Sequence, residues 1–404
     1  YTTEDTLSLH DALPISLETG HGPERAILVA LFREGVGEAS LDELAALAEA
    51  AGALVVGRLV QRRDAPESGT FIGSGKLREA AQAVLALSAD LLVVDDELTG
   101  SQIRNLEKGV GCRVIDRTML ILDIFARRAV SREGRLQVEL AQLKYRLPRL
   151  TGLGTVLSRL GGGIGTRGPG ETQLETDRRH LRRRIQSIER ELRLVAERRD
   201  RVREQRRAGR VVSIAVVGYT NAGKSTLVNR LCGSDLLVLD QVFATLDPSV
   251  RRLPGDSPTP VVLVDTVGFI RRLPHTLVEA FQSTLEEATQ ADAILEILDA
   301  ADPEADAMAE TVESVLQSLG AAGKPRFVVL NKTDLLDPAG AAGWMASLPR
   351  RTGDRVFEVS ARTGAGTEAL RNALLEWADR TGPVRTYRIP HRQAGLVSWI
   401  HRHG

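Results

Sequence analysis

Short apolar runs alternate with amphipathic helical patterns in the first part of the chain. These runs predict strands at 26–32, 53–60, 91–96 and 112–116. Segments with a helical pattern lie between these predicted strands. Because strand–helix alternation favours a parallel sheet, we predict a small parallel α/β domain over residues 24–130.

The pattern changes over residues 131–210, where it predicts two helices. The first carries leucines on one helical face and should end at Pro148; they are Leu136, Leu140, Leu143 and Leu147. Residues 152–172 are too rich in glycine for the interior of a helix or strand. In the second helix apolar residues recur with heptad spacing, at Leu174, Leu181, Ile185, Ile188, Leu192, Val195 and Val202. We predict an antiparallel, coiled-coil hairpin with a glycine-rich tip at 161–170.

Strand–helix alternation resumes over residues 211–382, with strands predicted at 211–218, 260–265, 293–298, 326–331 and 355–360. The predicted fold class is therefore α/β, with a helical hairpin between two α/β domains. Residues 383–404 begin a further α/β segment, a domain that we expect to be truncated. Residues 1–23 show no pattern that links them to the rest, so we leave them unassigned and expect that they are not native.

Composition excludes several classes of protein. Of the 404 residues, 43% are hydrophobic and 26% are charged, with a formal net charge of +0, as in an ordinary globular chain. Cys112 and Cys232 lie far apart, which argues against a disulfide framework or a zinc site and favours a cytoplasmic location. No apolar run approaches the roughly 18–20 residues of a membrane span. We therefore expect no segment that crosses a membrane.

Positive charge is concentrated in the second helix of the predicted hairpin. Between Glu171 and Arg210 the chain has fourteen arginines and eight acids. Two interpretations stay open: a solvated face with interleaved ion pairs, or an arm that binds the phosphates of a nucleic acid.

The segment Gly218-Tyr-Thr-Asn-Ala-Gly223-Lys224-Ser225 matches the phosphate-loop pattern, between a predicted strand and a predicted helix. Its backbone N–H groups can wrap phosphates at the helix N-terminus. Lys224 would reach the β and γ oxygens, and Ser225 would ligate Mg²⁺. The sequence therefore predicts a P-loop nucleotide-binding domain over residues 211–382.

Further metal-binding and phosphate-sensing groups follow along the chain. Asp265-Thr-Val-Gly268 ends a predicted strand, where an Asp holds magnesium and a Gly amide senses the γ-phosphate. Between the phosphate loop and this motif lies Phe243-Ala-Thr245-Leu-Asp247, in which Thr245 is the candidate for a second hydroxyl ligand. The predicted metal ligands are Ser225, Thr245 and Asp265.

Two later motifs predict selection of guanine. In Asn331-Lys332-Thr333-Asp334 the Asp334 carboxylate can accept hydrogen bonds from guanine N1–H and N2–H₂, which adenine does not present. Asn331 can reach the other edge of the base, and the Lys332 stem can lie on its plane. Ser360-Ala361-Arg362 can place a backbone N–H at the guanine carbonyl oxygen. GTP and GDP are therefore the expected ligands, and the chain is predicted to be a GTP hydrolase.

One position lacks the usual chemistry of water activation. Ras-type proteins carry a glutamine directly after the Asp265 motif, whereas this chain has Phe269, which cannot hydrogen-bond to water. We therefore expect slow intrinsic hydrolysis, with Lys224, Thr245, Gly268 and Asn221 as candidate catalytic residues. For Asn221 two interpretations have equal weight: it helps to hold a K⁺ ion at the phosphates, or it shapes the loop.

The residues that we predict to bind nucleotide come from these motifs. They are Gly218, Tyr219, Thr220, Asn221, Ala222, Gly223, Lys224, Ser225, Thr226, Phe243, Ala244, Thr245, Leu246, Asp247, Asp265, Thr266, Val267, Gly268, Asn331, Lys332, Thr333, Asp334, Ser360, Ala361 and Arg362.

The chain resembles the HflX group of ribosome-associated GTPases over roughly residues 24–404. Outside the shared GTPase motifs, the resemblance rests on long and specific segments at 114–118, 120–129, 133–143, 148–150 and 161–175. The segment at 243–247 and the Asp265 motif also match, including phenylalanine in place of glutamine. The ends differ: residues 1–23 have no counterpart, and the C-terminal domain is short.

The resemblance implies a partner as well as an activity. Members of the group bind the large ribosomal subunit and its RNA through the region that corresponds to 24–210, with the tip at 161–170 reaching toward the peptidyl-transferase centre. They hydrolyse GTP there and are implicated in separating or rescuing stalled ribosomes under stress. We expect a monomer that does not act on DNA. The alternatives are a ribosome-assembly or tRNA-modification GTPase, or a scaffold that hydrolyses little GTP.

Overall fold

The computed structural model describes residues 22–33, 36–150, 169–209, 211–233, 242–243, 245–272, 277, 282–336, 355–381, 389–390, 392, 395–397 and 399. The chain divides into two compact units. The N-terminal unit comprises Tyr1–Val195, Gln241–Phe243 and Arg272–Phe281. The C-terminal unit comprises Ala196–Asp240, Ala244–Arg271 and Gln282–Gly404.

The N-terminal unit is built on a parallel four-stranded sheet in the order β2-β1-β3-β4. Its strands are β1 (Arg25–Phe32), β2 (Leu54–Arg62), β3 (Leu91–Val94) and β4 (Arg113–Asp116). All four were predicted, with ends that differ by at most two residues. Strands β1 and β3 are buried almost throughout, as expected when helices cover both faces of a parallel sheet.

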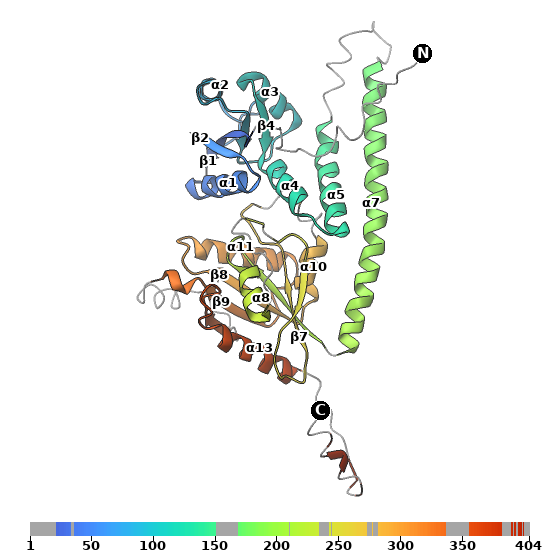
Figure 1. The fold of residues 1–404 in the computed structure, drawn as a ribbon. Coiled ribbons are helices and arrows are strands. Elements are labelled where there is room, and N and C mark those ends of the chain that lie inside the picture. The colour runs from blue at the N-terminus through green and yellow to red at the C-terminus, as the bar shows by residue number, and fades with distance from the viewer. Residues whose placement is uncertain are drawn as a thin grey trace. The chain divides into compact units, whose positions relative to one another are not determined.

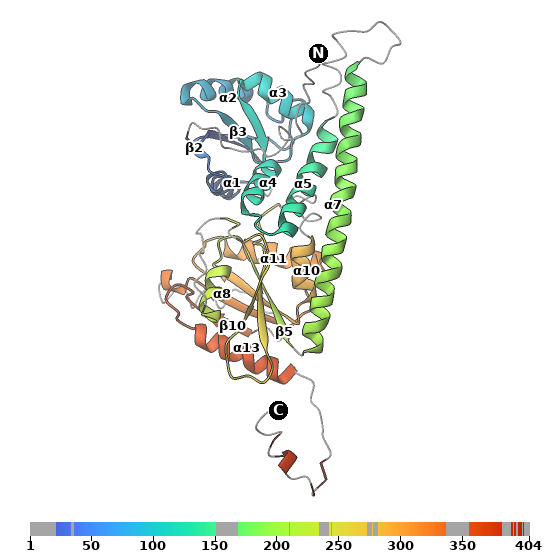
Figure 2. The same ribbon diagram turned by 45° about the vertical axis from the view of Figure 1, so that its right-hand side comes forward.

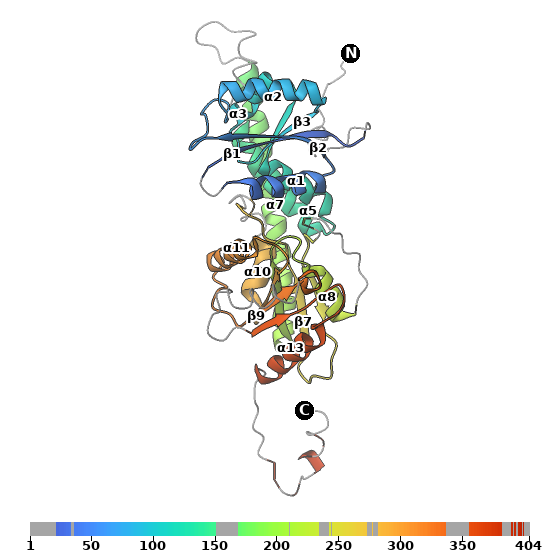
Figure 3. The same cartoon turned by 90° about the vertical axis from the view of Figure 1, so that its left-hand side faces the viewer.

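Helices cover both faces of this sheet (Figure 3). The helices are α1 (Glu38–Ala50), α2 (Ser74–Leu87), α3 (Gly100–Val110) and α4 (Arg117–Arg128). Helices α2 and α3 bury Ala80, Val84 and Leu106 against one face, in a cluster with β1 and β3. On the other side of the sheet lies α1, and α4 packs beside it. This α/β/α layering is the predicted fold of the region.

The predicted hairpin is formed by α5 (Arg132–Arg149) and α7 (Pro169–Ala208), which lie side by side in Figures 1 and 2. Part of the heptad pattern packs as expected, in a cluster that comprises Leu136, Leu140, Leu143, Leu181, Ile185, Ile188 and Leu192. Ion pairs Arg132–Glu191 at 2.8 Å and Arg184–Glu139 at 2.6 Å run in opposite order along the two helices. The hairpin is therefore antiparallel.

Both helices of the hairpin differ from the prediction near the tip. Helix α5 continues one residue past Pro148, because a proline in the last turn removes only one backbone hydrogen bond. Helix α7 begins at Pro169, inside the segment that we predicted to be non-helical. A proline suits the first position of a helix, where its missing N–H has no partner to lose. The rest of the glycine-rich tip, up to Gly168, lies outside the described residues.

The C-terminal unit contains a six-stranded sheet in the order β10-β9-β8-β5-β7-β6. The five predicted strands are present as β5 (Val212–Gly218), β7 (Val261–Asp265), β8 (Ala293–Asp299), β9 (Arg326–Asn331) and β10 (Arg355–Glu358), all parallel. The sequence analysis missed β6 (Ser249–Arg252), which pairs with β7 in antiparallel orientation. This edge strand is short and carries arginines, so it lacks the apolar run of a buried strand.

Helices again cover both faces of the second sheet. They are α8 (Lys224–Cys232), α10 (Gln282–Gln290), α11 (Ala305–Ser318) and α13 (Thr367–Thr381). Helices α8 and α13 supply Leu227, Leu231, Leu370 and Leu374 to the core on one face. Helix α11 packs on the other face, with Ala309 beside β8 and β9.

Within the described residues, no helix is long and apolar enough to cross a membrane. The further α/β segment predicted over residues 383–404 lies mostly outside the described residues.

Candidate functional site: a nucleotide site at the strand ends

The phosphate loop connects β5 to α8 and depends on glycine at both ends. Gly218 has φ 152°, and a Cβ there would lie 2.3 Å from the Ile297 carbonyl oxygen. Gly223 has φ 87°, and a Cβ there would lie 2.3 Å from the side-chain nitrogen of Asn331. Any side chain would therefore force the loop away from β8 and from the end of β9. Asn221 also has a positive φ, of 61°, a conformation that asparagine tolerates better than most residues.

Lys224 lies at the start of α8 with its ammonium group inside this loop. Its Nζ donates hydrogen bonds to the carbonyls of Gly218, at 3.2 Å, and Tyr219, at 2.7 Å. Burial lowers the pKa of Lys224 to about 8, and the nearby Asp265 carboxylate opposes that shift. A group this buried is poorly solvated as a cation, so the phosphate oxygens of a nucleotide would stabilise its charge.

The three predicted metal ligands lie together. Ser225 Oγ is 2.7 Å from Thr245 Oγ1 and 2.7 Å from Asp265 Oδ2, and Thr245 Oγ1 is 3.2 Å from the same carboxylate oxygen. Asp265 Oδ1 is buried and has no hydrogen-bond partner among the described residues. Burial raises the pKa of Asp265, whereas its hydrogen bond from Ser225 lowers it. Two hydroxyls and an under-coordinated carboxylate fit Mg²⁺, which prefers oxygen ligands.

Two apolar residues of the segment that carries Thr245 are buried. Leu246 is 3% exposed, and Asp247 is half-buried. Phe243 is 2% exposed and belongs to the N-terminal unit, so its ring lies in a hydrophobic contact and not among the groups of the loop. Ala244 lies outside the described residues.

The Asp265 motif packs directly against the phosphate loop. A Cβ at Gly268 would lie 2.9 Å from Lys224 Nζ and from Thr220, so this position also requires glycine. The backbone N–H of Phe269 donates to Gly218 O at 3.1 Å, and the N–H of Thr220 donates to Phe269 O at 2.8 Å. The Phe269 ring is 1% exposed. Phe269 is thus a core residue. Thr266 is also turned inward, and its Oγ1 donates to the Val216 carbonyl at 2.7 Å.

The two base-selecting motifs are joined by side-chain hydrogen bonds. Asn331 Nδ2 donates to the Ala222 carbonyl at 2.8 Å, and its Oδ1 accepts from the backbone N–H of Ala361 at 2.9 Å. Asn331 therefore connects the phosphate loop to the Ser360 loop. Asp334 Oδ1 accepts from Ser360 Oγ at 2.7 Å, and Arg362 lies 3.2 Å from Oδ2. The hydrogen bond from Ser360 lowers the pKa of Asp334, so it remains the ionised acceptor that guanine needs.

The structure adds residues that sequence reasoning did not identify. Asp299, at the end of β8, pairs with Lys332 Nζ at 2.6 Å and orients its stem. Arg230, on α8, donates to the Ala361 carbonyl at 3.3 Å and to that of Arg362. Asp299 could have been identified from the sequence, because a carboxylate at the end of a predicted strand is a pattern typical of a binding site. No sequence pattern indicated Arg230, because its partners lie 131 and 132 residues away.

Comparison with known sequence families agrees with this geometry. Residues 38–126 match the family described as GTP-binding GTPase N-terminal, and residues 128–206 match GTP-binding GTPase Middle Region. Residues 213–332, which include the phosphate loop and the Asn331 motif, match the family described as 50S ribosome-binding GTPase.

The chain is also similar to a solved structure and, at higher identity, to curated relatives. The crystal structure of a GTP-binding protein from the hyperthermophilic archaeon Sulfolobus solfataricus in complex with GDP is 27% identical and covers 88% of this chain and 99% of its own, with a TM-score of 0.45. The GTPase HflX of Caldanaerobacter subterraneus subsp. tengcongensis is 48% identical over 96% of this chain and 88% of its own length. The GTPase HflX of Escherichia coli is 44% identical over 93% of this chain and 88% of its own length. The chain therefore belongs to the HflX family and is a GTP hydrolase that binds guanine nucleotides.

Proposed function

We propose that this chain is a Mg²⁺-dependent GTPase that binds the large ribosomal subunit and acts in separating or rescuing ribosomes under stress. The observation that carries the metal-dependent part is the convergence of Ser225, Thr245 and Asp265 within hydrogen-bond distance of one another. The ribosomal part is supported by the match of residues 213–332 to a family described as ribosome-binding.

The residues of the site have separate tasks in this proposal. Lys224 and the loop amides hold the phosphates, and Asp334 accepts hydrogen bonds from guanine N1–H and N2–H₂. Asn331 sets the distance between the two ends of the nucleotide, because it bonds both the phosphate loop and the Ser360 loop. Magnesium, held by Ser225, Thr245 and Asp265, would neutralise charge on the β and γ phosphates.

Hydrolysis without a partner should be slow. Phe269 is buried and its ring has no hydrogen-bonding group, so this position cannot orient a water molecule. The proposed role of Asn221, which lies in the phosphate loop with φ 61°, is to help hold K⁺ at the phosphates. Replacing Na⁺ by K⁺ should then raise the rate. If Na⁺ and K⁺ give equal rates, Asn221 only shapes the loop.

Helix α7 offers a surface for ribosomal RNA. Some of its arginines are engaged in ion pairs, such as Arg184 with Glu139, and Arg203 with Glu287 at 2.6 Å. Others are exposed and have no acidic partner among the described residues; they are Arg179, Arg183, Arg190, Arg193 and Arg198. Ion pairs therefore account for only a part of the arginine surplus. We propose that the exposed set contacts phosphates.

Single-turnover GTP hydrolysis, with and without purified large subunits, tests the proposal. We expect large subunits to accelerate hydrolysis and small subunits to have no effect. No hydrolysis under either condition would support the scaffold alternative. Stimulation by immature subunits alone, or by tRNA, would support an assembly or modification GTPase.

A further inference from the structure

The Ser360 loop, residues 360–366, follows β10 in the C-terminal unit, and most of its backbone N–H groups are paired within that unit. The N–H of Ser360 donates to Ala365 O at 3.0 Å, and that of Gly364 donates to Ser360 O at 2.8 Å. The N–H of Thr363 donates to Ser360 Oγ at 3.1 Å. These bonds close the loop into a turn and leave few backbone donors for a nucleotide.

The two N–H groups in the middle of the Ser360-Ala361-Arg362 motif differ from each other. The N–H of Ala361 donates to Asn331 Oδ1 at 2.9 Å. The N–H of Arg362 has no hydrogen-bond partner among the described residues. Every backbone N–H is an obligatory donor, so this group must bond either water or a ligand. The direction in which it points therefore decides whether it serves the base.

Arg230 holds the opposite end of the same peptide group. Its Nε donates to the Ala361 carbonyl at 3.3 Å. This C=O and the Arg362 N–H belong to one planar, trans peptide, in which the two groups point in opposite directions. A guanidinium that holds the C=O on one side thus directs the N–H to the other side. Ala361 is 5% exposed, so its position is set by packing within the unit.

The second contact of Arg230 is made by the same edge of its guanidinium. Nη2 donates to the Arg362 carbonyl, and the rigid fork fixes both carbonyls at once. The peptide between Arg362 and Thr363 is also held at its N–H, by Ser360 Oγ. Among the described residues, the peptide between Ala361 and Arg362 is bonded by Arg230 alone. Its orientation is therefore the one that should respond to loss of this arginine.

The position of Arg230 joins the two ends of the nucleotide site through one short helix. Helix α8 begins at Lys224 in the phosphate loop, is nine residues long, and has Arg230 in its last turn. Its buried Leu227 and Leu231 fix it against the sheet. A cation in the last turn of a helix is favourable in itself. The hydrogen bonds of Arg230, however, go to the Ser360 loop and not to carbonyls of α8, which indicates a role beyond the helix.

We propose that Arg230 is a positioning residue for guanine recognition: it orients the peptide between Ala361 and Arg362 so that the Arg362 N–H donates to the 6-carbonyl oxygen of the base. A cation at the C=O also polarises the peptide and strengthens its N–H as a donor. The proposal rests on the base-selecting site described above. It assigns a reader to the carbonyl oxygen of guanine, whereas Asp334 faces the N1–H and N2–H₂ groups.

The test compares Arg230→Ala with Arg371→Ala in the full chain. Arg371 lies on α13 of the same unit and pairs with Glu368 at 3.9 Å, with a side chain that is 36% exposed. Within the described residues it makes no hydrogen bond to the Ser360 loop. Thermal unfolding of each variant, measured beside nucleotide binding, reports any general loss of stability.

Three diphosphates separate the contacts of the base, and Kd is measured for each. GDP makes all of them. 6-Thioguanosine diphosphate has a sulfur, a weak acceptor, in place of the carbonyl oxygen, and keeps both donors that face Asp334. Inosine diphosphate keeps the carbonyl oxygen and lacks the 2-amino donor.

The parent chain should prefer GDP to the 6-thio nucleotide. Arg230→Ala should weaken binding of GDP by about three- to tenfold, the range for one hydrogen bond, and should weaken binding of the 6-thio nucleotide less. The preference for GDP over inosine diphosphate should stay, because Asp334 keeps its bond from Ser360. Arg230→Lys should recover part of the lost preference, since an ammonium group can hold one of the two carbonyls. Arg371→Ala should resemble the wild type.

Equal weakening of GDP and the 6-thio nucleotide would show that Arg230 only stabilises the loop, and unchanged affinities would show that its contacts are inert. A parent chain that binds these two nucleotides equally would show that no backbone donor reads the carbonyl oxygen. Each of these results overturns the proposal. Affinities of the parent for GDP and ADP test the base-selecting site itself, so a failure of that site and a failure of the role of Arg230 are distinguishable.

Discussion

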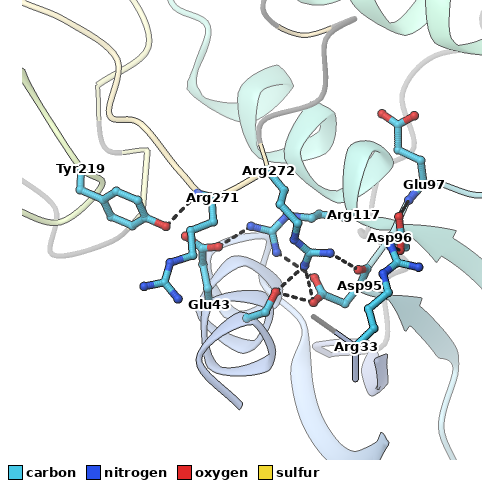
Figure 4. A network of polar contacts seen from close by, with 10 residues as sticks. Arg33, Glu43, Asp95, Asp96, Glu97, Arg117, Tyr219, Arg271 and Arg272 are labelled. Carbon is cyan, nitrogen blue, oxygen red and sulfur yellow. Dashed lines mark hydrogen bonds and ion pairs between the residues drawn. The ribbon is translucent and has the colours of Figure 1, made fainter. Parts of the chain in front are cut away.

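The N- and C-terminal units both present the carboxyl ends of parallel strands, yet the two sets of ends have different chemistry. In the C-terminal unit the strand ends carry glycines, hydroxyls and amides, and Asp265 Oδ1 has no hydrogen-bond partner among the described residues. In the N-terminal unit the equivalent position is filled by Asp95, Arg117 and Arg272, which satisfy one another (Figure 4). The same architecture therefore does not imply the same activity, because function depends on the groups that the loops supply.

The largest expected effect concerns the base-selecting end of the C-terminal site. Asp334→Asn should lower GTP affinity at least about 100-fold, because guanine donors would face an amide and remain unpaired. Xanthosine triphosphate, whose pattern suits an amide, should bind the variant better than GTP does. Nucleotide titrations would show this reversal. If the parent chain binds ATP and GTP equally, guanine selection has been misassigned.

Asp265→Asn, in the same unit, should lower GTP turnover without lowering the stability of the nucleotide-free protein. Loss of the carboxylate that we propose to bind Mg²⁺ should reduce GTP turnover by about 10²–10³, in the range seen when one charge-stabilising group is removed. Because burial raises the pKa of this carboxyl, the nucleotide-free variant should be no less stable than the parent. Turnover assays and denaturant titrations measure the two effects. A variant that retains full Mg²⁺-dependent turnover would exclude Asp265 as a ligand.

The exposed arginines of α7 can be tested against a paired one. A triple variant of Arg190, Arg193 and Arg198 to glutamine should bind large subunits more weakly. Its log–log salt slope should fall by about two to three, since each phosphate contact contributes about 0.7–0.9. Arg184→Gln is the matched control, because Arg184 already pairs with Glu139. Equal slopes for the parent and the triple variant would show that this face does not contact RNA.

The smallest expected effect is on a buried acid of the N-terminal unit that has no role in the GTP site. Asp123, on α4, has a side chain that is 2% exposed, with Arg127 at 3.4 Å. Burial raises its pKa from 3.8 to about 6. Above pH 6 the folded protein must hold a carboxylate that is better solvated in the unfolded chain, so this group disfavours folding there.

Asp123→Asn removes that penalty. The variant should be more stable than the parent at pH 7.5 by about 3 kcal/mol, the equivalent of a pKa shift of about two units at about 1.4 kcal/mol each. The difference should vanish below about pH 4, where Asp123 is protonated in both states. Denaturant unfolding between pH 4 and pH 8 measures it, and GTP affinity should not change. A variant less stable than the parent at pH 7.5 would mean that the charged pair with Arg127 dominates.

Most of the elements and the composition of the nucleotide site could be predicted from the sequence, because their signals are local. A buried strand shows as an apolar run, and the phosphate loop is a contiguous segment whose glycines, Gly218 and Gly223, are required by backbone contacts. The antiparallel β6 was missed since its stability comes from pairing with β7, and its own residues, Ser249–Arg252, carry no apolar pattern.

Only the tertiary structure decided which distant groups meet. Asn331 is a base-reading residue by its motif, but the fold uses both ends of its amide to join Ala222 to Ala361. Phe243 belongs by sequence to a GTPase motif, yet the fold buries it against Phe125 of α4, 118 positions earlier in the chain. Arg272 bonds Asp95 across 177 positions of the chain. Sequence periodicity reports which residues are buried, whereas the partner of a buried or charged group depends on how separate elements pack, and no local pattern encodes that choice.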